Sequence, residues 1–146
     1  MAYKFEIDED FCTGCSACVV ACKDKNGSPV GVNYRKVSCI ESGSFPNVKV
    51  AWTSQACRHC DDPECVEACP VNACYKREED GIVLIDEELC IGCKMCMEAC
   101  PYDAISYNEE TEKAEKCNAC LDLIKEGKKP YCVQAANSRV LDFVEK

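Results

Sequence analysis

Four blocks of closely spaced cysteines constrain this chain more than any other feature of its sequence. The 146 residues contain 17 cysteines, and all except Cys39 and Cys74 lie in these blocks. The block residues are Cys12, Cys15, Cys18, Cys22, Cys57, Cys60, Cys65, Cys69, Cys90, Cys93, Cys96, Cys100, Cys117, Cys120 and Cys132. In the third block, CIGCKMCMEACP, the spacing is one in which three thiolates bind one 4Fe-4S cubane and the fourth binds another. The spacing therefore predicts iron-sulfur clusters.

Disulfide bridges and structural zinc are the two other uses of so many cysteines. A disulfide framework suits small secreted chains, but residues 1–10 lack the apolar core of a signal peptide and the cysteine count is odd. Structural zinc sites use pairs of CxxC with a longer linker and often histidine, whereas this chain has one histidine. The repeated CxxCxxCxxxC run favours iron and sulfide over both.

The blocks are copies of one another, which indicates an internal duplication. Residues 7–15 read IDEDFCTGC and residues 85–93 read IDEELCIGC, so the first and third blocks correspond. Residues 63–70 read PECVEACP and residues 130–137 read PYCVQAAN, so the second and fourth blocks correspond as well.

This order predicts two nested ferredoxin-like modules, and we expect an α+β, double bacterial-ferredoxin-like fold of short strands and short helices. The outer module comprises residues 1–31 and 106–146, the inner module residues 56–105, and a hairpin insertion residues 32–55. The fourth cysteine of each run faces away from its own loop, so we expect the runs to exchange ligands. Proline after that cysteine, at Pro70 and Pro101, should turn the chain out of the preceding helix.

The duplication reveals a missing ligand. Cys69 of the second block corresponds to Ala136 of the fourth, and Pro70 corresponds to Asn137. If the outer blocks pair as the inner ones do, Cys22 completes the site of the fourth block, and the first-block loop has no fourth cysteine. We expect three complete 4Fe-4S clusters and, at Cys12, Cys15 and Cys18, a 4Fe-4S cluster with a non-cysteine ligand or a 3Fe-4S cluster.

Two cysteines and the histidine have simpler interpretations. We expect Cys39 and Cys74 to be buried small hydrophobes, as free cysteines usually are. Cys39 is also the only spare thiol that is able to replace the ligand lost at Ala136. We interpret His59 as a hydrogen-bond donor near cluster sulfur rather than a catalytic base.

The segments between the blocks predict a loop-rich domain with brief regular elements. The predicted strands are the two arms of a hairpin with a long turn, then three short apolar segments: Val32–Glu41, Val48–Thr53, Gly81–Ile85, Ile105–Tyr107 and Val140–Val144. The predicted helices follow the blocks: Ser16–Lys23, Glu64–Ala68, Lys94–Ala99 and Asn118–Lys125. A chain with so little regular structure buries too little apolar surface to fold on that alone, so we expect the protein without metal to be largely unfolded.

Most of the chain resembles a known family. The segments HCDDPECVEACP, EEDGIVLIDEELCIGCKMCMEACPYDAI and AEKCNACLDLIKEGKKPYCV are similar to the four-cluster electron-transfer subunits related to the beta subunit of dimethyl sulfoxide reductase. The resemblance runs from about Phe5 to Phe143. It implies a double ferredoxin fold and a subunit that docks on a larger catalytic partner with a molybdenum or tungsten pterin cofactor. Ala136 is the main departure from the family pattern.

Charge and hydropathy narrow the range of possible partners. A net charge of −9 argues against nucleic acid, whose binding needs Lys and Arg to neutralise phosphates. No apolar run approaches the roughly 20 residues that span a bilayer. Because exposed cubanes are damaged by oxygen, we expect the cytoplasm of an anaerobe. The hairpin from Val32 to Thr53 contains no block cysteine, and we expect it to contribute to docking.

The sequence shows no catalytic apparatus of its own. Dinucleotide and phosphate-loop patterns are absent. We therefore expect a non-catalytic iron-sulfur electron-transfer subunit that passes electrons between a larger oxidoreductase subunit and a further redox partner. The alternatives are a free-standing polyferredoxin that shuttles electrons between enzymes, and a zinc-stabilised interaction module.

Overall fold

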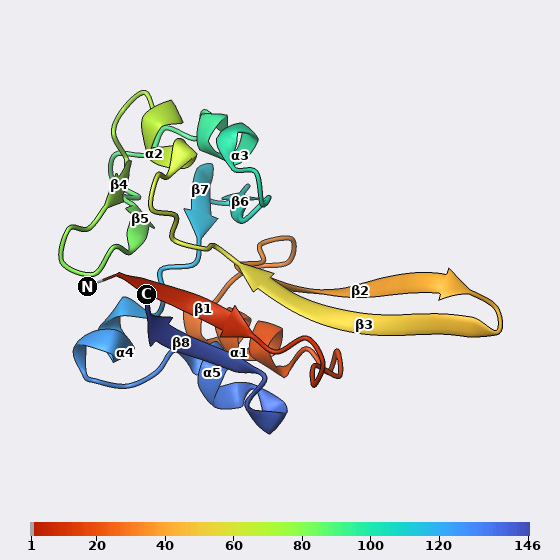
Figure 1. Ribbon diagram of the computed structural model, residues 1–146. Coiled ribbons are helices and arrows are strands. Elements are labelled where there is room, and N and C mark those ends of the chain that lie inside the picture. Colours follow the sequence, from red (N-terminus) through yellow and green to blue (C-terminus); the bar gives the residue numbers. More distant parts are fainter. Residues whose placement is uncertain (1) are drawn as a thin grey trace.

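The computed structural model describes residues 2–146 and has an α+β architecture of short elements around a small body (Figure 1). The helices are α1 Ala17–Asn26, α2 Glu64–Ala68, α3 Met95–Ala99, α4 Leu121–Lys125 and α5 Tyr131–Ala135, followed by a 3-10 turn at Asn137–Arg139. The strands are β1 Tyr3–Ile7, β2 Arg35–Ser44, β3 Asn47–Ala56, β4 Cys74–Lys76, β5 Val83–Ile85, β6 Ile105–Asn108, β7 Lys113–Lys116 and β8 Leu141–Glu145. No helix in this part of the chain is long and apolar enough to cross a membrane.

The strands form antiparallel pairs rather than one sheet: β1 with β8, β2 with β3, β4 with β5, and β6 with β7. The two ends of the chain meet in the first pair, where Tyr3 lies opposite Glu145 and Ile7 opposite Leu141. α1 packs against α5 next to this pair, and α2 packs against α3 beside β4 to β7 (Figure 1). The segments that follow the first and fourth blocks therefore lie together, as do those that follow the second and third.

The loops of the first and third blocks have the same backbone conformation. Gly14 and Gly92 both have φ +70°, and Ser16 and Lys94, which precede α1 and α3, have φ values of 62° and 64°. A Cβ at Gly14 would lie 2.4 Å from the ring of Trp52, so only glycine fits between this loop and β3. The duplication in sequence is thus also a duplication of loop geometry.

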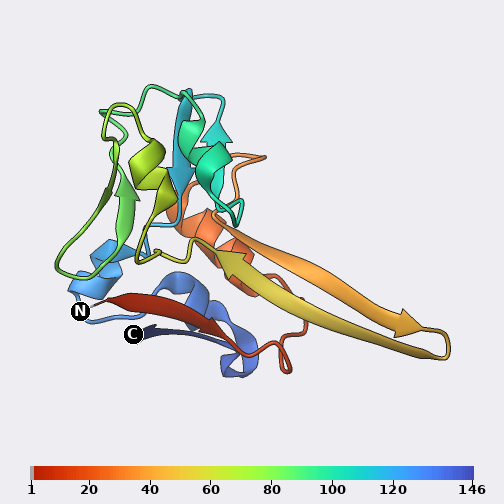
Figure 2. The same ribbon diagram turned by 45° about the horizontal axis from the view of Figure 1, so that its top comes forward.

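The hairpin of β2 and β3 extends from the body as a long two-stranded arm (Figure 2). Both strands have ten residues, and only Phe45 and Pro46 separate them, so the turn is much shorter than the long turn predicted from sequence. Cross-strand pairing continues past the predicted strand ends. Every register position is paired up to Ser44 and Asn47.

The sequence predicted the type and place of most elements, with shifts at their ends. α2 has the predicted bounds, and α3, α4, β5 and β8 start one to three residues later than expected, while α1 continues to Asn26, where Gly27 ends it with φ 58°. Strand β6 pairs with β7, which the sequence did not predict. The sequence analysis also missed β1, β4 and α5. The alternation of YKFEI in β1 was an available signal, and α5 corresponds in the duplication to the predicted α2.

The interior consists of four small clusters of buried side chains, and three of them contain buried cysteines. Their buried members are Cys74, Cys96, Ile105 and Ala114 in one group, Cys18, Cys132 and Leu141 in another, Cys57, Ala104 and Cys117 in a third, and Ile82, Ala119 and Phe143 in a fourth. Thiols therefore stand where a domain of this size would otherwise place aliphatic side chains.

The two cysteines outside the blocks differ in environment. Cys74 is buried, as predicted, and packs in the first of these groups. Cys39 is exposed, so the expectation that it is buried is wrong. Cys39 lies on β2 opposite Trp52, and it is the Trp52 ring rather than the Cys39 thiol that packs on the first-block loop at Gly14.

Candidate iron-sulfur sites

Cys57, Cys60 and Cys65 share one cavity with Cys100, although Cys100 is the last cysteine of the third block. α2 and α3, which end at Cys69 and Cys100, pack against each other and bring the two blocks together. Both helix-ending cysteines have extended backbone dihedrals and are followed by proline, as expected for a chain that turns out of the helix.

Cys69 packs with Cys90 against the buried group that contains Cys96 and Cys74. Cys65 and Cys100 pack against the same group, so the second and third blocks are neighbours. The neighbouring Cys74 thiol lowers the pKa of Cys96 through a hydrogen bond. Cys93 of the same loop is exposed at the surface.

Cys22 lies near Cys120 and Cys132, because α1 packs against α5. Burial, and then the charges of Cys132 and Cys120, raise the pKa of the Cys22 thiol to about 11. Burial also raises the pKa of Cys117 to about 12. These values mean that the thiols resist ionisation when no cation is among them.

The first-block loop faces a hollow with no fourth thiol. The hollow is lined by Cys12, Cys15, Cys18, Ser54, Ala136 and Asn137, together with apolar and small side chains, and not by Cys39. Ala136 ends α5 with φ −63° and ψ 129°, close to the −76° and 114° of Cys69 at the end of α2. The alanine therefore occupies the backbone position of the corresponding cysteine.

Polar groups contact the thiols of this hollow. The Asn137 side-chain amide donates to Cys15 Sγ at 3.5 Å, and the Ser54 hydroxyl lies 3.3 Å from Cys18 Sγ. A backbone hydrogen bond from Ala17 is the largest influence that lowers the pKa of Cys15. Sequence reasoning identified Asn137 only as the replacement for a proline and did not predict its contact with sulfur.

Lys116 joins the second and fourth blocks. Its buried ammonium donates to Cys57 Sγ at 3.3 Å and to the Cys117 carbonyl at 3.1 Å, and it also donates to the carbonyl of Val83. Because it contacts both blocks, Lys116 lies where the second and fourth blocks meet.

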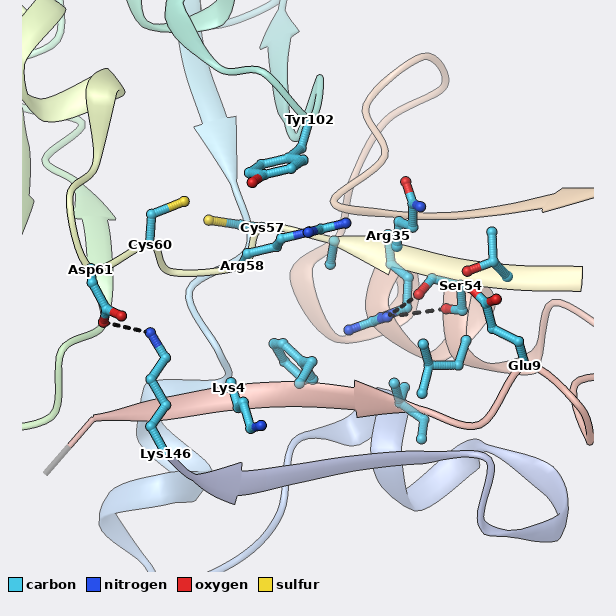
Figure 3. A pocket seen from close by; sticks show the side chains of 16 residues that line it. Lys4, Glu9, Arg35, Ser54, Cys57, Arg58, Cys60, Asp61, Tyr102 and Lys146 are labelled. Carbon is cyan, nitrogen blue, oxygen red and sulfur yellow. Dashed lines mark hydrogen bonds and ion pairs between the residues drawn. The ribbon is translucent and has the colours of Figure 1, made fainter.

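Arg35 is a second buried cation, which the sequence analysis did not identify. Its Nη1 donates to Ser54 Oγ at 3.0 Å and to the Ser54 carbonyl at 3.4 Å, and its guanidinium lies 4.6 Å from the centroid of Phe5. Arg35 lines a cavity of about 470 Å³ between β1 and the base of the hairpin (Figure 3). The alternation along β2 was the available signal, since Arg35 and Val37 share the face that packs on the body.

His59 contacts sulfur through its backbone rather than its ring. Its N–H donates to Cys57 Sγ at 3.4 Å, whereas its ring Nδ1 accepts from the Val83 N–H at 3.1 Å. Burial, and then the charge of Lys116, hold the pKa of His59 well below its ordinary value, so the ring is neutral. With Nδ1 as acceptor, the proton lies on Nε2, which is buried without a partner in the described part of the chain.

These observations fit iron-sulfur clusters. The donors are soft thiolates, which select iron-sulfur clusters, zinc or copper(I). Buried thiols gathered together ionise only at a high cost unless a metal supplies positive charge. In residues 2–146, no three His, Cys, Asp or Glu side chains converge on a single metal-ion position. Unpartnered buried N–H groups at Arg35 and His59 are donors that anionic clusters are able to satisfy.

Comparison with known proteins identifies the family. Residues 48–146 match the model described as a 4Fe-4S dicluster domain, and residues 3–24 match a 4Fe-4S binding domain. The chain belongs to the 4Fe-4S dicluster family. This membership confirms the sequence-based prediction of an iron-sulfur electron-transfer protein.

Relatives in this family include components of several oxidoreductases. The chain is 43% identical over 149 residues to a chain of the anaerobic dimethyl sulfoxide reductase of Escherichia coli strain K12, an alignment that covers 97% of this chain and 72% of that protein. It is 40% identical to a subunit of the sulfite dehydrogenase of Allochromatium vinosum, with 94% and 67% covered. It is 39% identical to protein NrfC of Escherichia coli strain K12, with 97% and 64% covered.

Replacing His59 tests its structural bond to Val83. His59→Leu should lower the free energy of unfolding by about 1–3 kcal/mol, because the buried Val83 N–H loses its acceptor. His59→Asn should lose less, since its side-chain oxygen is able to accept the same bond and asparagine tolerates the positive φ at this position. Anaerobic thermal unfolding and amide hydrogen exchange at Val83 measure both effects. Equal exchange of the Val83 amide in the two variants would contradict this role.

Proposed function

We propose that this chain is the electron-transfer subunit of a larger oxidoreductase, whose partner subunit carries a molybdenum or tungsten pterin cofactor and performs the substrate chemistry. The observation that carries this proposal is the set of four cysteine groups, which includes exposed thiols at Cys15 and Cys93 and buried thiols at Cys57 and Cys117. The relatives named as components of a reductase and of a dehydrogenase support the assignment to a multi-subunit enzyme.

In this proposal the fifteen block cysteines form four sites by exchange of ligands between paired blocks. The sites are Cys57, Cys60, Cys65 and Cys100; Cys90, Cys93, Cys96 and Cys69; Cys117, Cys120, Cys132 and Cys22; and Cys12, Cys15 and Cys18 without a fourth cysteine. The cavity shared by Cys57 and Cys100 and the proximity of Cys22 to Cys132 support this exchange.

The same exchange supports two nested modules. The outer module comprises residues 1–31 and 106–146, where β1 pairs with β8 and α1 packs on α5. The inner module comprises residues 56–105, and residues 32–55 form the hairpin insertion. Strand β7 directly precedes the fourth block. Its last residue, Lys116, contacts Cys57 Sγ of the second block, so it links the two modules.

The contacts between blocks support a linear order of the proposed sites. The first-block site adjoins the fourth-block site through Cys18 and Cys132, which pack in one buried group. The fourth-block site adjoins the second-block site at Lys116, and the second adjoins the third across α2 and α3. Bound clusters supply one-electron chemistry along this line. The chain's own residues bury the sulfurs, exclude water and hold Lys116 at the central junction.

The first-block site is proposed to hold either a 4Fe-4S cluster with a non-cysteine ligand or a 3Fe-4S cluster. All three thiols of the loop remain, and Gly14 and Ser16 keep the backbone conformation of the complete third-block loop. The amide of Asn137 and the hydroxyl of Ser54 place polar groups beside the thiols Cys15 and Cys18.

The hairpin is proposed as the docking element for the larger subunit. Arg35, Val37, Trp52 and Ser54 share one face, which covers the body near the first-block loop. Beyond the body, the same face carries Val48 and Val50, which are 52% and 55% exposed. Exposed apolar side chains on a face that extends beyond the body offer a surface for another protein. A partner bound to this face would lie next to the first-block site.

The exchange of ligands is tested by Cys69→Ala. We expect this variant to alter the paramagnetic resonance signal of the third-block site, since Cys69 is proposed as its fourth ligand. Cys39→Ala, which removes an exposed thiol outside the blocks, should leave iron content and all signals unchanged. An effect confined to the signal of the second-block site would refute the pairing.

Restoring the missing thiolate tests the first-block site. Ala136→Cys should lower the reduction potential of this site and slow its conversion to 3Fe-4S under mild oxidation, because a thiolate adds negative charge and a fourth iron ligand. Anaerobic iron and sulfide analysis and a redox titration measure both forms. If the natural protein holds only about twelve irons, as three cubanes require, and Ala136→Cys adds none, the site is empty.

The docking role is tested in the native complex. A tagged chain purified anaerobically from its host should bring a larger subunit that contains molybdenum or tungsten. The double variant Val48→Ser, Val50→Ser should lower the ratio of these metals to iron at least several-fold while its own iron stays constant. Ile40→Ser is the matched control, since Ile40 is exposed on the opposite face. A chain that purifies alone with all its iron would favour the free-standing polyferredoxin. The exposed thiols at Cys15 and Cys93 also fit that alternative, because external redox partners could approach them.

A further inference from the structure

Arg35 is a buried charge without a carboxylate partner. Its side chain is 2% exposed, and no Asp or Glu lies within ion-pair distance of it in residues 2–146. Its Nη2 group has no hydrogen-bond acceptor among these residues. A buried guanidinium needs an opposite charge to offset its lost hydration. The cysteine sites next to it are where anionic clusters would supply that charge.

The guanidinium is held in place at the junction of the two outer blocks. Two hydrogen bonds from Nη1 fix it to Ser54 (Figure 3). The Ser54 hydroxyl lies 3.3 Å from Cys18 Sγ of the first block, and Cys18 packs in one buried group with Cys132 of the fourth block. Val37, which shares the strand face of Arg35, packs against the same group.

We propose that Arg35 is a fixed positive charge that raises the reduction potentials of the first-block and fourth-block sites. Reduction adds one negative charge to a site, and a nearby cation stabilises the reduced form more than the oxidised form. Arg35 shares a cavity with Cys57 and Cys60 of the second block, whereas the third-block site lies beyond that block in the proposed line. Arg35 therefore raises the potentials of the first-block and fourth-block sites relative to the third-block site. This inference rests on the proposed ligand sets.

Arg35 differs from Lys116 in the role that its charge plays. Lys116 has three acceptors and lies between the second and fourth blocks, next to the ligand Cys117. Arg35 is remote in sequence from every block, and the oxygen atoms that accept its hydrogen bonds belong to Ser54. A change at Arg35 therefore removes charge without altering a cluster-binding loop.

The experiment is a redox titration of the iron-loaded full chain, followed by paramagnetic resonance under anaerobic conditions. In Arg35→Gln, the ratio of reduced to oxidised clusters at a fixed potential should fall on the order of tenfold at the two outer sites, by Coulomb's law with an effective dielectric constant of about 20. For a one-electron couple, tenfold corresponds to about 59 mV. The third-block site should keep its potential and serves as the internal reference.

Two variants separate local charge from packing and from net charge. Arg35→Lys keeps the positive charge and should retain outer-site potentials close to those of the natural protein. Lys36→Gln removes the same charge from the neighbouring residue, whose side chain is exposed and paired with Asp103, and it should leave all potentials unchanged. Equal shifts in Arg35→Gln and Lys36→Gln would overturn the proposal, as would unchanged outer sites in a fully loaded Arg35→Gln.

If Arg35→Gln fails to take up iron, loading itself becomes the measurement. Full loading of Arg35→Lys beside failed loading of Arg35→Gln and Arg35→Met would support the need for a positive charge, whereas failure of all three would overturn it. The absence of 4Fe-4S clusters from the natural protein would instead refute the proposed function. The two failures are therefore distinguishable.

Discussion

The burial of cysteine thiols against one another is the constraint on which this structure depends. Three of its four small buried groups contain block cysteines, and its helices after α1 have five residues each. Such elements bury too little apolar surface to offset the conformational entropy of the chain. Metal ligation then contributes folding free energy as well as redox chemistry, because thiols this close and this buried ionise only with a cation among them.

Electrostatics follows from the same constraint. A protein with a net charge of −9 nevertheless buries Arg35 and Lys116, each beside residues of two different blocks. Buried cations without carboxylates are stable only beside another source of negative charge. Lys116 contacts residues of the second and fourth blocks, and Arg35 is linked through Ser54 to the first. The buried cations therefore lie where the proposed sites of different blocks would adjoin.

The hairpin shows how one strand face serves two purposes. Near the body, this face anchors Arg35 and places Trp52 over Gly14, where a side chain larger than hydrogen would collide with the ring. Farther out, it carries exposed valines away from the body. The alternation of a two-stranded ribbon keeps both parts on the same side, which connects a proposed partner surface with the first-block loop.

Spacing and repetition in the sequence by themselves determined the blocks, the prediction of iron-sulfur clusters and the correspondence of Ala136 with Cys69, because ligand spacing is a local property of the chain. α2 was also predictable, since the block that contains it and the proline after Cys69 define both of its ends. Tertiary structure alone decided that Cys39 is exposed and that β6 pairs with β7, because burial and pairing depend on segments remote in sequence. It also decided the place of Arg35, which Ser54 links to Cys18 near the start of the chain, where Cys18 packs with Cys132 from near its end.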